Sequence, residues 1–189
     1  MAPRPRERIL AAATRLFSEE GIHATGVDRV IAEAGVAPMT VYRHFAGKDE
    51  LVTATLERWS EQWLGWLRSE ARGDDARARL EGLWDALEKW FADEGFHGSY
   101  VANVANELRA KPGHPAQATI AAHRAALREL LGELATAAGV PSPAAAAVAL
   151  HTLIDGATAV AVIDRQPGAA ASARAMAAAV LAEPALAGR

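Results

Sequence analysis

Apolar residues recur every three or four positions along almost the whole chain, and this spacing predicts a series of amphipathic helices. Near the N-terminus the pattern predicts three short helices, over about residues 6–20, 26–34 and 38–45. Gly21 is expected to end the first helix in a left-handed conformation, and Gly35 is expected to end the second.

The boundaries of the second and third helices carry further sequence signals. Thr25 with Asp28 three residues later is typical of a capping box at the start of the second helix. Pro38 suits the first turn of the third, because its fixed φ matches a helix. Residues 26–45 therefore predict a helix, a tight glycine turn and another helix.

The rest of the chain continues the same periodicity and contains no alternating, strand-like stretch. A long helix is expected from Lys48, with Leu56, Trp59, Trp63 and Trp66 on one side, up to the break at Gly73. Five more follow, so the whole chain is predicted to be all-α with about nine helices. The later helices are expected over about 80–91, 101–108, 115–138, 143–165 and 169–181.

Composition supports this fold class and removes several functions. Alanine, the strongest helix former, supplies 46 of the 189 residues. The chain has no cysteine, which excludes disulfides, thiolate metal sites and thiol catalysis. The N-terminus has no apolar run of the signal-peptide kind, so we expect a cytoplasmic protein. Residues 144–163 could span a bilayer by length, but His151 and Asp155 argue against a membrane location.

The net charge of −3 conceals an uneven distribution. Residues 1–48 contain seven Lys and Arg against five Asp and Glu, and residues 34–48 contain no acidic residue at all. Arg4, Arg6 and Arg8 add a basic N-terminal segment that could follow a DNA backbone or enter a minor groove. This asymmetry permits a local nucleic-acid interface in an acidic protein.

The segment that begins at Pro38 has the two faces that a DNA-reading helix needs. Val41 and Phe45 share one side of the helical wheel and are expected to face inward. The opposite side could contact bases and phosphates, although an ordinary corner between two helices, with a solvated outer face, predicts the same periodicity. That side carries Met39, Thr40, Arg43 and His44, with Tyr42 at its flank.

The stretch from Arg6 to Val52, RERILAAATRLFSEEGIHATGVDRVIAEAGVAPMTVYRHFAGKDELV, resembles the N-terminal DNA-binding domain of the TetR family of bacterial repressors. The resemblance rests on the combination of Leu16-Phe17, Gly21, Thr25, Ile31-Ala32, Gly35-Val36, Tyr42-Arg43-His44-Phe45, Lys48 and Leu51. It implies a DNA-binding domain over 1–47, a helical effector-binding and dimerisation domain over 48–189, and a homodimer on double-stranded operator DNA.

The resemblance also implies residue roles. Thr25, Tyr42, His44 and Lys48 would hold phosphates, while Pro38, Met39, Thr40 and Arg43 would face bases. Arg6 is expected to contact DNA as part of the basic N-terminal segment. Ala37 departs from the small hydroxyl residue often found there, which removes a side-chain cap from the third helix.

The last two predicted helices carry few charges along faces of Ala, Val, Leu and Ile. We expect two such helices from each of two protomers to form a four-helix interface, although they could instead be internal core. Two-fold symmetry would then require a palindromic operator.

The aromatic residues between 59 and 100 are consistent either with plain core or with an apolar pocket that has a few polar anchors. For the pocket we expect a small apolar or amphipathic effector lined by Trp63, Trp66, Asn103, Asn106 and His123. Glu107, His114 and His123 could hold a divalent metal, but their spacing does not decide it, and no cofactor is predicted.

Catalytic motifs such as Gly-x-Ser-x-Gly, a phosphate-binding glycine loop or His-Glu-x-x-His are missing from the sequence, so an enzyme is not expected. The sequence favours a transcriptional regulator, most simply a repressor, that an effector releases from DNA. The alternative is a DNA-binding regulator whose filled core takes no small molecule and which a protein partner controls, or which acts constitutively.

Overall fold

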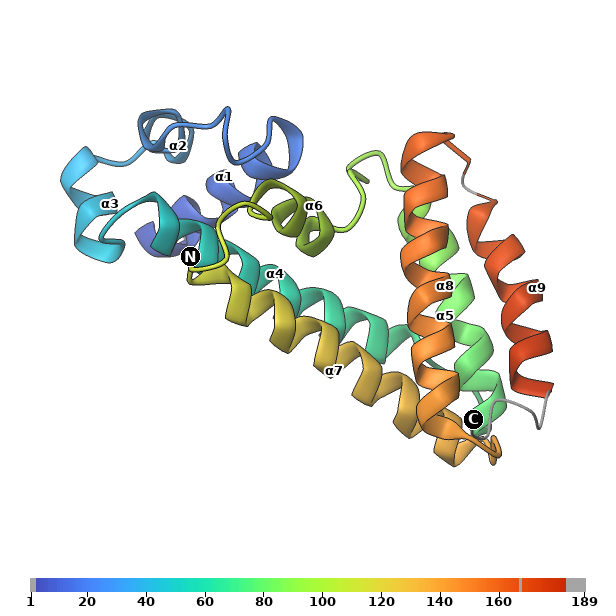
Figure 1. Cartoon of the computed structure of the whole chain (residues 1–189). Coiled ribbons are helices and arrows are strands. Elements are labelled where there is room, and N and C mark those ends of the chain that lie inside the picture. The colour runs from blue at the N-terminus through green and yellow to red at the C-terminus, as the bar shows by residue number, and fades with distance from the viewer. Residues whose placement is uncertain (1–2, 167, 183–189) are drawn as a thin grey trace. The chain divides into compact units, whose positions relative to one another are not determined.

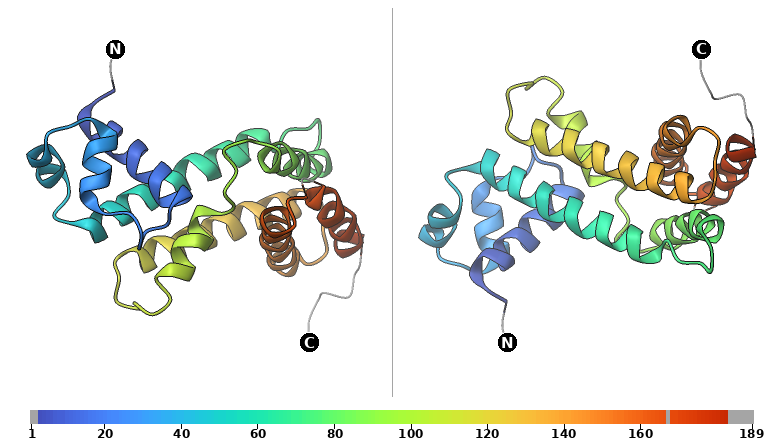
Figure 2. Two further views of the ribbon diagram at one scale, coloured as in Figure 1. Left: turned by 90° about the horizontal axis from the view of Figure 1, so that it is seen from above. Right: turned by 90° about the horizontal axis from the view of Figure 1, so that it is seen from below.

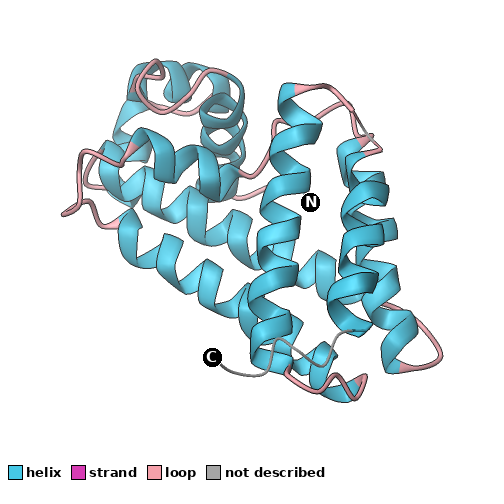
Figure 3. Ribbon diagram, turned by 45° about the vertical axis from the view of Figure 1, so that its right-hand side comes forward, coloured by secondary structure: helices cyan, strands magenta, loops and turns pink. Residues whose placement is uncertain are grey.

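The computed structural model describes residues 3–166 and 168–182, and within these ranges the chain forms nine helices and no strand (Figures 1 and 3). The all-α prediction is confirmed, and each predicted helix appears with its ends close to the expected positions. The helices are α1 Pro5–Glu19, α2 Val27–Ala34, α3 Pro38–His44, α4 Lys48–Glu70, α5 Ala76–Phe91, α6 Tyr100–Glu107, α7 Ala116–Ala137, α8 Pro143–Ile163 and α9 Ala169–Ala182.

The described helices pack as two compact units, each of which has its own interior. Unit 1 comprises residues 1–62 and 100–123, and unit 2 comprises residues 63–99 and 124–189. The long helices α4 and α7 each contribute their first part to unit 1 and their second part to unit 2.

Unit 1 has a continuous apolar core that extends past residue 47. Helices α1, α2 and α3 pack on one another through side chains such as Leu16, Val30 and Val41. The same core includes Leu56 from α4 and Val104 from α6. Within this unit the first part of α7 lies beside α4 (Figure 2), and the side chains of His123 and Ser60 join them. The three N-terminal helices therefore share their interior with α4, α6 and α7.

Glycines end the first two helices as predicted. Gly21 has φ +87° and Gly35 has φ +59°, both in the left-handed region that glycine adopts without steric cost. The predicted capping box at Thr25 is wrong, because the N-cap of α2 is Gly26 and makes no side-chain cap. At the other end of the chain, Ser142 and Pro143 occupy the N-cap and first position of α8, as predicted.

Unit 2 is built around α8 and α9, which run side by side, with α5 packed on α9 (Figure 1). Its interior is made of leucines from α5, α7 and α8 and of buried alanines from α8 and α9. Arg174 on α9 donates to Glu81 Oε2 and Asp85 Oδ1 on α5, at 2.7 Å each. The small alanine side chains allow close helix packing, and Arg174 links α9 to α5 at the surface of unit 2.

Helix α8 is long and apolar enough to cross a membrane by length and composition alone. It nevertheless buries the polar side chain of His151, and its Asp155 accepts a hydrogen bond from Arg124 on α7 at 3.0 Å. Burial lowers the pKa of His151, which the neighbouring Asp155 opposes and the charges of Arg124 and Arg128 reinforce. His151 is therefore held neutral at the packed surface between α7 and α8.

Candidate nucleic-acid interface

Helix α3 presents one buried and one exposed side, as its sequence predicts. Val41 and the following Phe45 are 1 % and 2 % exposed and anchor the helix in the core of unit 1. Pro38, Met39, Tyr42 and Arg43 are exposed, with Met39 at 76 %, and Thr40 and His44 are half-buried. The predicted base-facing and phosphate-facing side chains of α3 therefore come together on one accessible side of unit 1.

The start of α3 is fixed by the backbone alone. Ala37 is the N-cap in an extended conformation, and it makes no side-chain capping bond, as the departure from a hydroxyl residue predicts. Pro38 supplies the pre-set φ of the first turn, and the Thr40 N–H donates to the Ala37 carbonyl at 2.8 Å. The third helix consequently begins at a defined residue although it lacks a cap.

Basic residues from neighbouring elements flank this helix, but they do not form a free arm. Arg6 lies in the first turn of α1, is exposed, and has its guanidinium carbon 5.6 Å from the centre of the Phe45 ring. This cation–π contact keeps the Arg6 charge close to the end of α3. Arg8 instead donates to the carbonyls of Ala34 and Gly35 at 2.6 and 2.7 Å and so caps the end of α2. The prediction that Arg8 contacts the DNA backbone is therefore wrong, because its guanidinium is bound to the end of α2.

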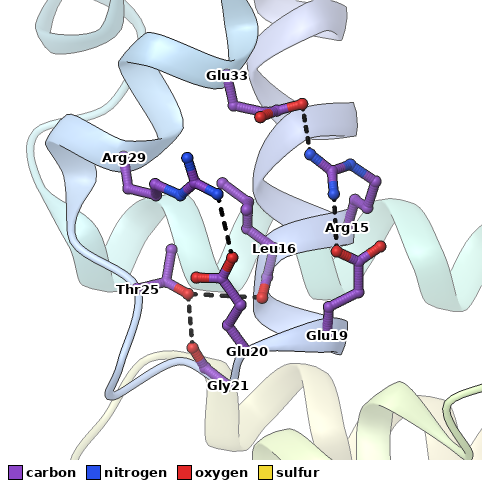
Figure 4. A network of polar contacts seen from close by, with 8 residues as sticks. All are labelled: Arg15, Leu16, Glu19, Glu20, Gly21, Thr25, Arg29 and Glu33. Atoms are coloured by element: carbon purple, nitrogen blue, oxygen red, sulfur yellow. Dashed lines mark hydrogen bonds and ion pairs between the residues drawn. The ribbon is translucent and has the colours of Figure 1, made fainter.

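Thr25 does not occupy the position that its predicted phosphate contact requires. The residue is 0 % exposed, and its hydroxyl donates to the Gly21 carbonyl at 2.8 Å, with the Leu16 carbonyl at 3.5 Å (Figure 4). The Leu16 carbonyl lies in the last turn of α1 and also accepts the Glu20 N–H, and Gly21 lies just after the helix. Thr25 therefore stabilises the turn between α1 and α2 from inside, and its hydroxyl is not available to DNA.

Around this turn, surface ion pairs link α1 and α2 (Figure 4). Arg15 on α1 contacts both Glu19 and Glu33, and Arg29 on α2 lies 3.4 Å from Glu20. Exposed pairs of this kind contribute little stability each, so the packing of Thr25 and the buried core determines the relation of the two helices.

Lys48 is the first residue of α4 and is half-buried. Glu50 accepts a hydrogen bond from the Ala46 N–H at 2.6 Å, which fixes the short connection between α3 and α4. Asp49 and Glu50 lie in the first turn, where acidic residues suit the helix dipole. Lys48 is thus held directly after α3 by a defined backbone.

The residues predicted to line an effector pocket fall into both units. Trp63 and Trp66 belong to unit 2, where both rings pack against Trp90, with centroids 5.5 and 6.5 Å apart. Phe91 and Phe96 extend this aromatic cluster, the latter ring 4.9 Å from that of Trp90. The aromatic rings of unit 2 therefore pack mainly on one another.

The three polar pocket candidates belong to unit 1. His123 is buried, accepts or donates a hydrogen bond with the Ser60 hydroxyl at 2.8 Å, and packs against Trp59. Asn103 is half-buried, but Asn106 is exposed, so the argument that a buried amide needs a ligand does not apply to Asn106. A role of these residues in effector binding stays a prediction.

The possible metal ligands take separate partners. Glu107 accepts hydrogen bonds from the backbone N–H groups of Ile22 and His23, and His114 lies 3.3 Å from Asp49. Among the described residues no group of three or more His, Asp or Glu side chains is arranged to hold a metal ion.

Sequence reasoning missed a buried polar pair next to these residues. The Thr55 hydroxyl lies 2.9 Å from the Tyr100 phenol oxygen, and both residues are almost completely buried. Burial raises the pKa of Tyr100 far above its usual value, so the phenol remains protonated and able to donate. The sequence signal for this pair is a threonine, Thr55, among apolar residues on one side of a helix. That signal does not identify Tyr100, 45 residues away, as its partner.

Comparison with known proteins identifies this arrangement. Residues 9–55 match the family model described as bacterial regulatory proteins of the tetR family. The solved structure of SCO4454, a TetR-family transcriptional regulator from Streptomyces coelicolor, has 31 % sequence identity and a TM-score of 0.82, and the match covers 94 % of each chain. Reduced NemR from Escherichia coli has the same fold with a TM-score of 0.80, at 21 % identity over 91 % of this chain and 95 % of that one.

Curated relatives match over part of their length. The transcriptional activator FasR of Mycolicibacterium smegmatis is 33 % identical over 88 residues, which is 44 % of this chain and 40 % of FasR. The transcriptional regulator LmrA of Bacillus subtilis is 40 % identical over 57 residues, or 30 % of each protein. These alignments span well under half of the relatives, whereas the likeness to SCO4454 covers nearly the whole chain. The chain belongs to the TetR family of helix-turn-helix transcriptional regulators, which are DNA-binding proteins and not enzymes.

Proposed function

We propose that this regulator is a repressor that binds a palindromic operator as a homodimer and is released by a small apolar or amphipathic effector. The observation that carries the DNA-binding part is the exposed side of α3, which holds Met39, Tyr42 and Arg43 over the buried anchors Val41 and Phe45. Because its target is chromosomal DNA, we place the protein in the bacterial cytoplasm.

The exposed side chains suit different parts of a DNA duplex. Arg43 can donate two hydrogen bonds to a guanine edge, Thr40 can contact a base, and Met39 can pack on a thymine methyl group. Pro38, at the start of α3, also faces the bases. Phosphates would be held by residues at the flanks, whose charge or hydroxyl groups remain accessible. These are Arg6, Tyr42, His44 and Lys48.

The homodimer is supported by the outer side of α8 and α9. Val160 on α8 is 40 % exposed, and Met176 on α9 is 59 % exposed. Between these helices lies an apolar hollow of about 230 Å³ that Val160, Gly156 and Met176 help to line. An uncharged surface of this kind on two adjacent helices is suited to a second copy of the same chain. The two α3 helices would then reach successive major grooves, about 34 to 36 Å apart or a multiple of that distance.

Salt dependence tests the DNA contact. Binding of the full-length protein to promoter fragments is expected to weaken steeply as salt rises, because each phosphate contact releases counterions. Lys48→Ala should reduce the slope of log affinity against log salt by about 1.8, because the homodimer loses one contact in each half-site and each contact accounts for about 0.9. Fluorescence anisotropy between ~50 and 200 mM salt measures both slopes. A protein that binds none of its candidate promoter fragments at low salt would contradict the proposed function.

An effector is supported less directly, by the partly exposed rings of Trp66, Trp90 and Phe96 in unit 2 and by the buried His123–Ser60 pair in unit 1. Apolar surface with a few polar groups is the usual composition of a small-molecule site. The assignment of Trp63, Trp66, Asn103, Asn106 and His123 to an effector site stays a prediction from the sequence. Release of DNA would require a coupling free energy of ~1 to 3 kcal/mol between the binding of the effector and the binding of operator DNA.

The close packing of Trp63, Trp66 and Trp90 also favours the alternative, a regulator with a filled core. A thermal-shift screen separates the two. A compound that binds the folded protein at ~100 times its dissociation constant should add ~2.7 kcal/mol of stability, and by linkage operator DNA should weaken its binding. Trp66→Ala should abolish the shift, while a compound bound equally well with and without operator would contradict effector release.

A further inference from the structure

The segment that joins α6 to α7 contacts the helix-turn-helix region of unit 1 at a turn far away in sequence. The Glu107 carboxylate, at the end of α6, accepts hydrogen bonds from the N–H groups of Ile22 at 2.9 Å and His23 at 2.8 Å. The His23 Nε2 lies 3.2 Å from the Glu107 carbonyl oxygen, an acceptor left over at the end of a helix. The turn between α1 and α2 and the end of α6 therefore satisfy each other's backbone groups.

A second contact joins the other end of the same segment to α4. His114 Nδ1 accepts a hydrogen bond from the Ala116 N–H at 3.1 Å, which leaves the proton of a neutral ring on Nε2. That Nε2 faces Asp49 Oδ1 at 3.3 Å. Asp49 lies in the first turn of α4, immediately after Lys48. His114 is buried and the Asp49 side chain is 68 % exposed, so this contact lies at the surface of unit 1.

Internal hydrogen bonds stiffen the segment between the two contacts. Gln117 Nε2 donates to the carbonyls of Leu108 and Lys111 at 3.2 and 3.4 Å. The Lys111 N–H donates to the Leu108 carbonyl at 2.8 Å, and the His114 N–H to the Lys111 carbonyl at 3.0 Å. Residues 107–117, which we call the α6–α7 corner, therefore form a compact block and not a loose loop.

We propose that the α6–α7 corner fixes the turn before α2 relative to the start of α4, and that Glu107 and His114 are thereby positioning residues for operator binding. Helices α2 and α3 follow the turn at Ile22 and His23 that Glu107 contacts. Lys48 directly precedes Asp49, which His114 contacts. The corner thus sets the placement of the exposed side of α3 relative to Lys48. This inference rests on the proposed contacts of α3 and Lys48 with DNA.

The contact of Glu107 with the turn depends on a full carboxylate and on a glycine beside it. Each carboxylate oxygen accepts one backbone N–H, and hydrogen bonds to a charged acceptor are stronger than neutral ones. A glutamine would present one oxygen and one NH₂ group, so one of the two N–H groups would lose its acceptor. A Cβ at position 21 would lie 3.3 Å from Glu107 Oε1, so Gly21 also leaves the space that the carboxylate occupies.

Glu107→Gln, with Glu57→Gln as the matched control, tests the proposal. Glu57 is an exposed residue of α4 in the same unit, and both changes remove one negative charge, which by itself favours DNA binding. Glu107→Gln is nevertheless expected to weaken operator affinity by roughly 5- to 30-fold, within the range of coupling between sites. Because Glu107 itself contacts no phosphate, the salt slope should equal that of the wild type.

Hydrogen exchange supplies a readout specific to the turn. In Glu107→Gln, peptides that contain the amides of Ile22 and His23 should exchange faster, while peptides from α3 should retain their protection. His23→Ala removes only the reciprocal contact to the Glu107 carbonyl, so it serves as a milder variant if Glu107→Gln folds poorly. It should weaken operator affinity in the same direction and by a smaller factor.

The outcomes are distinguishable. If Glu107→Gln lowers the melting temperature but binds operator as tightly as Glu57→Gln does, Glu107 is only a structural residue and the proposal is overturned. An unchanged affinity in both Glu107→Gln and His23→Ala overturns it as well. Failure of the wild-type protein to bind DNA would instead contradict the proposed function on which the inference rests.

Discussion

Val160→Asp is expected to convert the dimer into a monomer and to lower operator affinity by ~100-fold or more, the factor gained when two sites bind together. Val160 lies on the outer side of α8 and helps to line the hollow between α8 and α9. In the dimer a carboxylate there would be buried against apolar side chains without a partner, which is strongly unfavourable. Sedimentation analysis and operator titration measure the two effects.

The same substitution at a neighbouring exposed valine provides the control. Val162 is 44 % exposed and lies two residues further along α8, on the flank that carries Asp155 and away from the row formed by Thr152, Gly156 and Val160. Val162→Asp should leave the protein dimeric. Each variant should fold, because both positions are already accessible to solvent within the chain. A Val160→Asp protein that remains a dimer at micromolar concentration would contradict the assignment of this face to dimerisation.

The helices could be predicted because their ends and faces are determined by local sequence. Gly21 and Gly35 mark the left-handed residues that end α1 and α2, and Pro38 and Pro143 mark first turns. The buried side of α3 could be predicted for a similar reason. Val41 and Phe45 are four residues apart, which in a helix places two side chains on one face whatever their surroundings.

The partners of polar side chains could not be predicted from the same local rules. Thr25 precedes Asp28 at the spacing of a capping box, yet the N-cap of α2 is Gly26 and the Thr25 hydroxyl donates to the Gly21 carbonyl just after α1. Arg8 belongs to a basic sequence, but its guanidinium reaches carbonyls 26 and 27 residues away. Which partner Thr25 and Arg8 take depends on how the helices pack. Their residue types alone fit both the predicted role and the observed one.

The partners of the predicted metal-binding and pocket residues also depend on how the helices pack, so local sequence rules did not predict them. Glu107, His114 and His123 are residues that could bind a metal, and helical spacing does not show that their partners are a turn, Asp49 and Ser60. The helical repeat of α6 places Asn106 opposite the buried Val104, and the structure leaves it exposed. Family resemblance was therefore informative for the first 52 residues, where a local motif carries the function, and less so beyond them.

Arg43→Ala is expected to weaken operator binding by roughly 30-fold or more, corresponding to ~2 to 6 kcal/mol for one bidentate base contact of ~1 to 3 kcal/mol in each of the two half-sites. Arg43 is exposed on α3 and has no hydrogen-bond or ion-pair partner recorded among the described residues, so its guanidinium is available to DNA. The loss should be concentrated at one base position in each half-site. The measurement is the affinity of the variant for a set of operators, each with one base pair changed symmetrically in both half-sites. The variant should no longer distinguish bases at the position that Arg43 contacts.

Arg43→Lys separates the shape of the side chain from its charge. Lysine retains the positive charge but not the planar fork that donates two parallel hydrogen bonds. If Arg43 contacts a base, Arg43→Lys should retain the salt slope of the wild type and still lose most of the preference at the same position. If Arg43 contacts only phosphate, Arg43→Lys should bind nearly as the wild type does, and Arg43→Ala should weaken binding to all sequences equally and reduce the salt slope. That second pattern would remove Arg43 from the base-facing set and leave Met39 and Thr40 as the side chains of α3 that distinguish sequences.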